Sequence, residues 1–386
     1  MSKTANWNYP TSVRFGAGRI QELPELCKSI GMLRPLLVTD RGLGSAPITL
    51  AAVDSLKEAG LGAALFSDLK PNPVEGNLDA GLAAYRAGKH DGVVAFGGGS
   101  GLDMGKLIAF MSGQARPVWD FEDIGDWWTR ADPRGIAPII AVPTTAGTGS
   151  EVGRAGILTD ERTHTKRIIF HPQMMPRIVI SDPALSVGMP AFITAGTGMD
   201  ALSHCLEAYC APGFHPLADG IAVEGMRLVK GALVRAVKQP DDLDARADML
   251  AAAAMGATAF QKGLGGMHAL AHPIGALYDT HHGMTNATLM PYVLKFNRSA
   301  IEERITRLAA YLGLANPGFD SFLEMVLQLR AEVGVPHSLA ELGLDDGKTA
   351  LIAQMAVADP SAGGNPLPLT EEKVGQLFTN ALHGRL

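Results

Sequence analysis

The pattern of apolar positions changes between the two halves of the chain. In the first half, short runs of consecutive apolar residues alternate with longer stretches of helical periodicity. An unbroken apolar run predicts a strand that is buried on both faces, as in a parallel sheet. The alternation therefore predicts an α/β layer with helices on both faces of the sheet. We expect strands near residues 13–15, 35–40, 63–66, 91–96, 137–142 and 177–182, one hairpin after residue 160, and helices near residues 20–30, 46–59 and 76–88.

After Pro183 the strand pattern ends and helical periodicity dominates. This shift sets the expected boundary between an α/β domain over residues 1–184 and an all-α domain over residues 185–386. The chain shows no internal repeat. The predicted helices lie near residues 190–211, 216–238, 242–262, 267–278, 284–313, 318–333, 347–357 and 370–382.

Composition excludes several broad classes of protein. The 386 residues are 47% hydrophobic and 19% charged, with a formal charge of −6, which argues against a nucleic-acid or anionic-membrane surface. Only three cysteines are present, too few for a disulfide framework, which favours a reducing compartment. The polar start MSKTANWNYP lacks the core of a signal peptide, and no apolar run approaches the ~20 residues of a membrane span. We expect a cytoplasmic enzyme.

Two polar clusters in apolar surroundings are the strongest candidates for chemistry. Asp200 and His204 lie four residues apart in GTGMDALSHCLEAY, so a helix places them on one face. Residues 265–283 add four of the eleven histidines. A lone histidine on an apolar helix is usually a hydrogen-bonded core residue, but buried charge is costly unless it is paired or metal-bound. The hypothesis is a divalent metal, Fe(II) or Zn(II), held by Asp200, His204 and two of the later histidines. These are His268, His272, His281 and His282.

A glycine loop follows the predicted strand at residues 91–96. Glycines at a strand-to-helix turn allow close approach of a ligand, and the helix N-terminus offers N–H groups to a phosphate. The other interpretation is a capping box, with Ser100 as N-cap and Asp103 at the third helical position, and the two interpretations can hold at once. The loop is not a G-x-G-x-x-G fingerprint, because residue 102 is Leu. The candidate residues are Gly97, Gly98, Gly99, Ser100 and Asp103.

A second small-residue loop, residues 143–152, follows the strand at 137–142. Its hydroxyl groups could contact a pyrophosphate or a nicotinamide, and the alternative is an ordinary polar loop. Asp40 also lies at a strand end, where a carboxylate can accept hydrogen bonds from an adenosine ribose and repels a 2′-phosphate. Ligands collect at the carboxyl ends of parallel strands, so these segments predict a dinucleotide site, with the reaction between the two domains.

Taken together, the motifs resemble the iron-dependent (group III) alcohol dehydrogenase family over nearly the whole chain. The resemblance implies a dehydroquinate-synthase-like fold, with a Rossmann-like dinucleotide domain, a helical metal-binding domain and usually a homodimer. The motifs that carry it are Gly97-Gly-Gly-Ser-x-x-Asp-x-x-Lys106, Pro143-Thr-Thr-Ala-Gly-Thr-Gly-Ser-Glu151, Gly198-Met-Asp-Ala-Leu-x-His204, His268-x-x-x-His272-Pro, His282-Gly and Asp359-Pro-Ser-x-x-x-Asn365-Pro.

The resemblance also implies roles for single residues. His272 matches a histidine near the reactive centre that is not a ligand, and a carboxylate at Asp40 goes with NAD rather than NADP. His282 is preferred over His281 because it precedes the glycine and lies fourteen residues after His268. The implied metal ligands are Asp200, His204, His268 and His282. The implied dinucleotide contacts are Asp40, Asn72, Gly98, Gly99, Ser100, Thr144, Thr145, Thr148 and Lys166, to which the loops add Gly97, Asp103 and Ser150.

The expected reaction is interconversion of an alcohol and an aldehyde or ketone with NAD(H). A metal would act as Lewis acid on the substrate oxygen, and His272 would either relay a proton or pack beside Pro273. The sequence departs from the family at Met104-Gly105 and at Gly153-Arg154, where a cleft-facing Arg154 would hold a substrate carboxylate. The alternatives are a hydroxy-acid, semialdehyde or polyol dehydrogenase, a dehydroquinate-synthase-like lyase, or a sensor that binds NAD and metal without turnover.

Overall fold

The computed structural model describes residues 11–163 and 165–386, which divide into two compact units. Residues 11–145 and 149–188 form an α/β unit, and Met189–Leu386 form a helical unit to which Ala146–Thr148 also belong. The polar first ten residues lie outside the described part of the chain. Each unit is described by itself.

The α/β unit is built on a six-stranded parallel sheet, as predicted. Its order is β1-β8-β5-β4-β2-β3, and every neighbouring pair is parallel. All residues of β2, β4, β5 and β8 are buried, as their unbroken apolar runs predicted. The strands are β1 (Ser12–Phe15), β2 (Pro35–Val38), β3 (Ala64–Phe66), β4 (Gly92–Gly97), β5 (Ile139–Pro143) and β8 (Ile178–Ser181).

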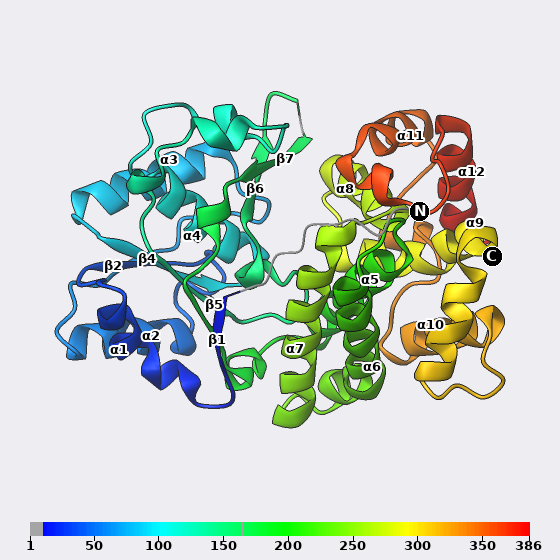
Figure 1. The fold of residues 1–386 in the computed structure, drawn as a ribbon, viewed down its shortest axis with the longest axis horizontal. Coiled ribbons are helices and arrows are strands. Elements are labelled where there is room, and N and C mark those ends of the chain that lie inside the picture. Colours follow the sequence, from blue (N-terminus) through cyan, green and yellow to red (C-terminus); the bar gives the residue numbers. More distant parts are fainter. Residues whose placement is uncertain (1–10, 164) are drawn as a thin grey trace. The chain divides into compact units, whose positions relative to one another are not determined.

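Helices cover both faces of this sheet (Figure 1). α1 (Leu23–Ser29) and α2 (Pro47–Glu58) lie on one side, and α3 (Glu75–Ala87) and α4 (Gly99–Met111) lie on the other. α4 packs closely on β4, because a Cβ added to Gly105 would lie only 2.5 Å from the Cβ of Ala95.

The strand order reverses between β2 and β4. From β2 the chain moves outward to β3, and from β4 it moves in the other direction through β5 to β8. At such a reversal the two following loops diverge and leave a crevice at the carboxyl ends of the strands. Asp40 and the glycine loop follow these two strands.

One prediction about this unit was wrong in its position. The hairpin consists of β6 (Ala155–Asp160) and β7 (Thr165–Phe170), so it begins ahead of residue 160, where the sequence analysis placed it. In β6 the buried positions are Gly156, Leu158 and Asp160, so one buried residue has no side chain and another is charged. This composition hides the alternation that would have identified the strand.

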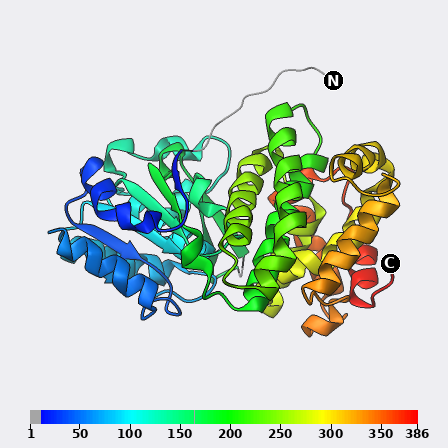
Figure 2. The same cartoon turned by 90° about the horizontal axis from the view of Figure 1, so that it is seen from below.

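The helical unit is organised around α5 (Ala191–Cys210), on which every residue from Met199 to Cys210 is buried. A helix buried on all sides must be surrounded by others, and α5 packs against three of them (Figure 2). These are α6 (Pro216–Lys238), α7 (Leu243–Ala259) and α9 (His282–Tyr311).

Glycines let these neighbours approach α5. A Cβ added to Gly225 on α6 would lie 2.6 Å from the Sγ of Cys205, and one added to Gly256 on α7 would lie 2.9 Å from the Cβ of His204. On α9, a Cβ at Gly283 would lie 2.1 Å from the backbone oxygen of Gly196.

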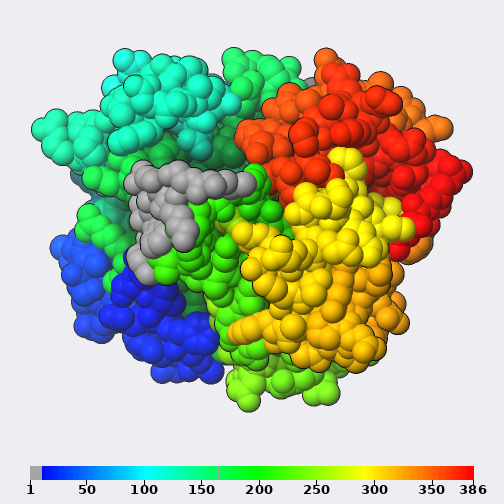
Figure 3. All heavy atoms as spheres, turned by 45° about the vertical axis from the view of Figure 1, so that its right-hand side comes forward, coloured from blue at the N-terminus to red at the C-terminus, as the bar shows by residue number. Residues whose placement is uncertain are grey.

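The remaining helices complete the unit, and α9 to α12 form the yellow-to-red surface in Figure 3. Their positions agree with the predicted ranges to within a few residues. They are α8 (Gly266–Tyr278), α10 (Phe319–Glu332), α11 (Thr349–Ala358) and α12 (Glu371–Leu382). Among the described residues, no helix combines the length and apolarity needed to cross a membrane.

Candidate metal and dinucleotide sites

Asp200 and His204 lie one turn apart on α5, and both are buried, with 3% and 5% of their surface exposed. The Oδ2 atom of Asp200 is 4.0 Å from the Nε2 atom of His204. The predicted shared face of the helix is therefore confirmed. This face of α5, which carries Asp200 and His204, is buried.

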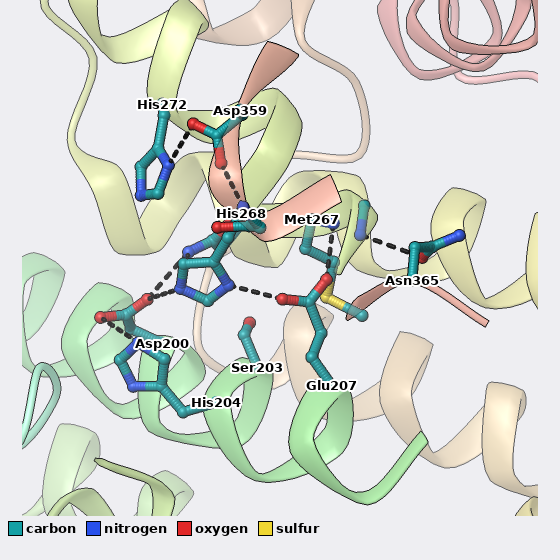
Figure 4. A network of polar contacts seen from close by, with 12 residues as sticks. Asp200, Ser203, His204, Glu207, Met267, His268, His272, Asp359 and Asn365 are labelled. Atoms are coloured by element: carbon teal, nitrogen blue, oxygen red, sulfur yellow. Dashed lines mark hydrogen bonds and ion pairs between the residues drawn. The ribbon is translucent and has the colours of Figure 1, made fainter. Parts of the chain in front are cut away.

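His268, in the first turn of α8, lies against this pair (Figure 4). Its Nε2 atom is 3.8 Å from Oδ1 of Asp200, and its ring stacks on that of His204 with centroids 4.8 Å apart. One ligand atom from each of the three residues lies within 4.8 Å of the other two. Burial and the neighbouring His204 imidazole lower the pKa of His268 well below its ordinary value. His268 is thus a neutral imidazole, the form that binds metal ions.

His282 reaches the same carboxylate from the start of α9, where its Nε2 atom is 3.7 Å from Oδ1 of Asp200. The preceding His281 has a different function, because its Nδ1 atom accepts a hydrogen bond from the backbone N–H of Met284 and caps α9. Its ring also packs edge-on against Phe192. The geometry therefore agrees with the choice of His282 over His281, and its role as a ligand stays a prediction.

The four side chains fit a divalent cation by their chemistry. Within the described chain, three imidazoles lie within 4.0 Å of the Asp200 carboxylate, and no Lys or Arg balances its charge. A buried carboxylate without a Lys or Arg partner is costly, and a bound cation would offset its desolvation. One carboxylate and three imidazoles form a donor set that suits Fe(II) or Zn(II).

Asn286, one turn after His282 on α9, is a site residue that the sequence analysis missed. Its amide nitrogen donates to Oδ1 of Asp200 at 2.9 Å, and it lies 3.2 Å and 3.1 Å from the Nε2 atoms of His268 and His282. It is fully buried. The i, i+4 spacing from His282 was the available signal.

His272, one turn after His268, pairs with a carboxylate from a distant part of the chain. Its Nδ1 atom is 2.9 Å from Oδ2 of Asp359, 87 residues away (Figure 4). Burial raises the pKa of Asp359, but hydrogen bonds from His272 and Ser361 outweigh it and hold that pKa below its ordinary value. The His272 ring is parallel to that of His282, with centroids 5.4 Å apart, so His272 lies beside the ligand cluster.

Glu207 is a second carboxylate that the sequence analysis did not assign. It lies on α5, is 5% exposed, and its Oε2 atom is 2.6 Å from the Nδ1 atom of His268. Burial raises the pKa of Glu207 to about 7, against the opposing effect of backbone N–H groups at Met267 and Gly265.

In the α/β unit, several of the predicted dinucleotide residues lie at the carboxyl ends of β2, β4 and β5. Asp40 follows β2, and its Oδ2 atom would lie 3.7 Å from a Cβ added to Gly97 at the end of β4. The N–H of Thr144, after β5, donates to the backbone oxygen of Gly97 at 2.9 Å. A Cβ added to Gly98 would lie 3.2 Å from the side chain of Thr145. The glycine loop after β4 thus lies against the segment after β2 on one side and the loop after β5 on the other.

The capping-box interpretation of the glycine loop was wrong. α4 begins at Gly99 with Gly98 as its N-cap, and no side chain caps it within the described residues. Because the helix starts one residue earlier than Ser100, Asp103 lies beyond the first turn. The first N–H groups of α4 are therefore not capped by a side chain, and such groups suit a phosphate.

Asp103 and Ser150 instead bond to one another. The hydroxyl of Ser150 donates to Oδ1 of Asp103 at 2.5 Å, and the N–H of Ile157 donates to Oδ2 at 3.1 Å. The ammonium of Lys106 lies 3.2 Å from Asp103 and donates to the backbone oxygens of Ser150 and Ala155. This network holds the end of the second loop against α4. A dinucleotide contact by Asp103 or Ser150 stays a prediction.

Asn72 and Lys166 lie on either side of β6. The N–H of Thr159 on β6 donates to the backbone oxygen of Pro73 at 2.8 Å, next to Asn72. Thr159 also pairs with Lys166 across the hairpin. Thr148 belongs to the helical unit. The dinucleotide contacts predicted for these three residues remain predictions.

Comparison with known proteins agrees with both units. The sequence model described as iron-containing alcohol dehydrogenase matches residues 10–183, and the model of the C-terminal part of the Fe-containing alcohol dehydrogenase family matches residues 194–382. The 4-hydroxybutyrate dehydrogenase of Cupriavidus necator is 37% identical over 368 residues, covering 93% of this chain and 94% of that protein.

The NAD-dependent methanol dehydrogenase of Bacillus methanolicus is 32% identical over 384 residues, covering 98% of this chain and 100% of that protein. The crystal structure of a 1,3-propanediol oxidoreductase superposes with a TM-score of 0.93 at 35% identity, covering 98% of this chain and 100% of the other. Because sequence and fold agree over nearly the full length of these proteins, the chain belongs to the iron-containing alcohol dehydrogenase family.

Proposed function

We propose that this protein interconverts small alcohols with aldehydes or ketones by hydride transfer to or from NAD(H), at a divalent metal site. The observation that carries the proposal is the buried cluster of Asp200, His204 and His268, which the partly exposed His282 also approaches. Membership of the family supports the same reaction.

Asp200, His204, His268 and His282 would hold the metal. The metal supplies Lewis acidity toward the oxygen of an alcohol or a carbonyl group, which favours the alkoxide or polarises the carbonyl. The family description favours Fe(II), and the donor set accepts Zn(II) equally well.

His272 is proposed to exchange a proton with the substrate oxygen, directly or through water. Asp359 engages its Nδ1 atom at 2.9 Å, which leaves Nε2 as the nitrogen for proton exchange. The side chain of His272 is 21% exposed and that of Asp359 12%, so the pair combines a fixed orientation with solvent access.

NAD, rather than NADP, is the proposed cofactor. Asp40 places a carboxylate at the end of β2, where a 2′-phosphate would be repelled. The pyrophosphate is assigned to the first N–H groups of α4, which Gly98, Gly99 and Ser100 expose. A relative of similar length is an NAD-dependent methanol dehydrogenase.

Homodimerisation and a cytoplasmic location are proposed as well. β1 lies at one edge of the sheet, and Val13 and Phe15 on it are 39% and 42% exposed, so an apolar strand edge is available for a second copy. The three cysteines are buried and unpaired, which agrees with a reducing compartment.

The proposal is tested by NADH oxidation with anaerobically purified protein that is stripped and then reloaded with Fe(II) or Zn(II). The substrates are short aldehydes, 3-hydroxypropanal, and semialdehydes with a terminal carboxylate. We expect metal-dependent turnover that His268→Ala reduces by at least about a thousandfold. Loss of all turnover with every metal, while NAD still binds, would favour a binding protein without catalysis.

A further inference from the structure

Glu207 connects the two helices that carry most of the predicted ligands. It lies on α5, three residues after His204, and its carboxylate makes two contacts with the start of α8 (Figure 4). The Oε2 atom is 2.6 Å from Nδ1 of His268, and Oε1 accepts a hydrogen bond from the N–H of Met267 at 2.6 Å. Both oxygen atoms of the carboxylate therefore form hydrogen bonds with residues of α8.

The first N–H groups of α8 donate their hydrogen bonds to side chains that are distant in the sequence. Its N-cap is Gly265, and no local side chain caps it among the described residues. The N–H of Gly266 donates to Oδ1 of Asn365 at 3.0 Å, and the N–H of Met267 donates to Glu207. A Cβ added to Gly265 would lie 3.2 Å from Oε1 of Glu207, so the glycine keeps this approach open. The carboxylate thus lies at the positive end of the α8 dipole, where its oxygen atoms can accept from the free N–H groups of the first turn.

This arrangement determines which nitrogen of His268 faces the metal site. Because Oε1 accepts from the N–H of Met267 and Oε2 faces Nδ1 of His268, we assign Oε2 as a second acceptor and place the proton of this bond on Nδ1. The lone pair is then on Nε2, the atom that lies 3.8 Å from Oδ1 of Asp200. A carboxylate behind a ligating imidazole fixes its tautomer and its ring orientation.

We infer that Glu207 is a positioning residue that holds His268 with Nδ1–H toward itself and presents Nε2, together with Asp200, to the divalent metal. The inference rests on the proposed metal site. Glu207 acts through His268 and is itself no ligand, because its two oxygens are engaged by Met267 and His268.

Glu207→Gln tests the inference with a nearly isosteric side chain. The amide oxygen can keep the bond to the N–H of Met267, and the NH2 group then donates to Nδ1 of His268. That bond favours the tautomer with the proton on Nε2, which has no lone pair for a metal. We expect the dissociation constant for Zn(II), measured by competition with a chromogenic chelator on stripped protein, to rise by about 10- to 100-fold.

Asn365→Ala is the matched control. Asn365 also caps the start of α8, through Gly266, and exchanges hydrogen bonds with Asn297 at 2.8 Å, but none of its hydrogen bonds reaches His268. We expect this variant to lower the melting temperature of the metal-free protein while Zn(II) affinity stays within about twofold. Equal losses of affinity in both variants would assign Glu207 a structural role only and overturn the inference.

The tautomer can also be read in the unmutated protein, which covers the case that Glu207→Gln fails to fold. In ¹⁵N-histidine spectra of the Zn(II)-loaded protein, His268, assigned by its loss in His268→Ala, should carry its proton on Nδ1. A proton on Nε2 would overturn the inference. Failure of the unmutated protein to bind Zn(II) would instead contradict the proposed metal site, so the two failures are distinguishable.

Discussion

Gly283 shows how a residue without a side chain determines the geometry of the ligand cluster. It follows His282, and α9 can bring that histidine to Asp200 only because the start of α9 touches α5. A Cβ at Gly283 would lie 2.1 Å from the backbone oxygen of Gly196 and 3.2 Å from the Cβ of Asp200. The sequence motif His282-Gly therefore has a steric reason in addition to the chemical one.

Gly283→Ala is expected to push α9 away from α5, because the added atom meets backbone that cannot move alone. We expect a loss of about 3 kcal/mol in the free energy of unfolding, measured in urea, and a weaker affinity for Zn(II). Gly220→Ala is the control, since Gly220 is an exposed position in α6 with nothing within 4 Å of an added Cβ. It should gain about 0.5–1 kcal/mol from helix propensity and leave metal binding unchanged.

Asp40 carries the prediction about cofactor choice. Replacing it with alanine removes the charge that would repel a 2′-phosphate, so kcat/KM with NADPH relative to NADH should rise roughly tenfold, or about 1.4 kcal/mol. Asp54→Ala, at an exposed position of α2, makes the same change in net charge and should not alter this ratio. An unchanged ratio in Asp40→Ala would mean that another group selects the cofactor.

At the scale of elements, the long periodic helices were predicted well and the short or irregular elements were not. α5 to α12 agree with the sequence patterns because each is a long stretch without strand signals, in which apolar positions recur over several turns. The start of α4 was misplaced because the backbone at Gly98, with no side-chain signal, determines it. The hairpin was misplaced because β6 buries a glycine and an aspartate.

The segment that links β5 to β6 contains a buried carboxyl group, Glu151. Burial raises the pKa of Glu151 to about 7, although Lys106 opposes the shift. The folded state therefore binds this proton more tightly than the unfolded chain, in which the pKa is about 4.3. The contribution of protonated Glu151 to the free energy of unfolding is therefore complete below a pH of about 4.3 and is lost as the pH rises through about 7.

Glu151→Gln removes this titration and keeps the shape of the side chain. Relative to this variant, the unmutated protein should lose about 3 kcal/mol of unfolding free energy between pH 4.5 and pH 7.5, and then no more. Urea unfolding at several pH values measures the difference. A difference that does not change with pH would show that Glu151 does not titrate in this range.

At the scale of the whole molecule, the sequence predicted which residues form the sites better than it predicted what supports them. Asp200, His204 and His268 could be found because helical spacing and family motifs place them together. The partners of the histidines could not, because they come from distant positions. Glu207 is 61 residues from His268, and Asp359 is 87 residues from His272. Such pairs become visible only when the packing of α5, α8 and the segment after α11 is known.

The division into two units predicts that metal and cofactor protect different parts of the chain. All four predicted ligands lie on α5, α8 and α9 of the helical unit, whereas Asp40 and the glycine loop belong to the α/β unit. A ligand that binds only the folded state stabilises the elements that hold it, by about 2.7 kcal/mol at a hundredfold excess over its dissociation constant.

In hydrogen exchange followed by mass spectrometry, Zn(II) added to stripped protein should slow exchange in α5, α8 and the start of α9. NAD alone should slow exchange at residues 97–103. His268→Ala should abolish the first effect and leave the second, because its side chain contributes only to the metal cluster. Protection of the glycine loop by Zn(II) alone would contradict the assignment of the two sites to separate units.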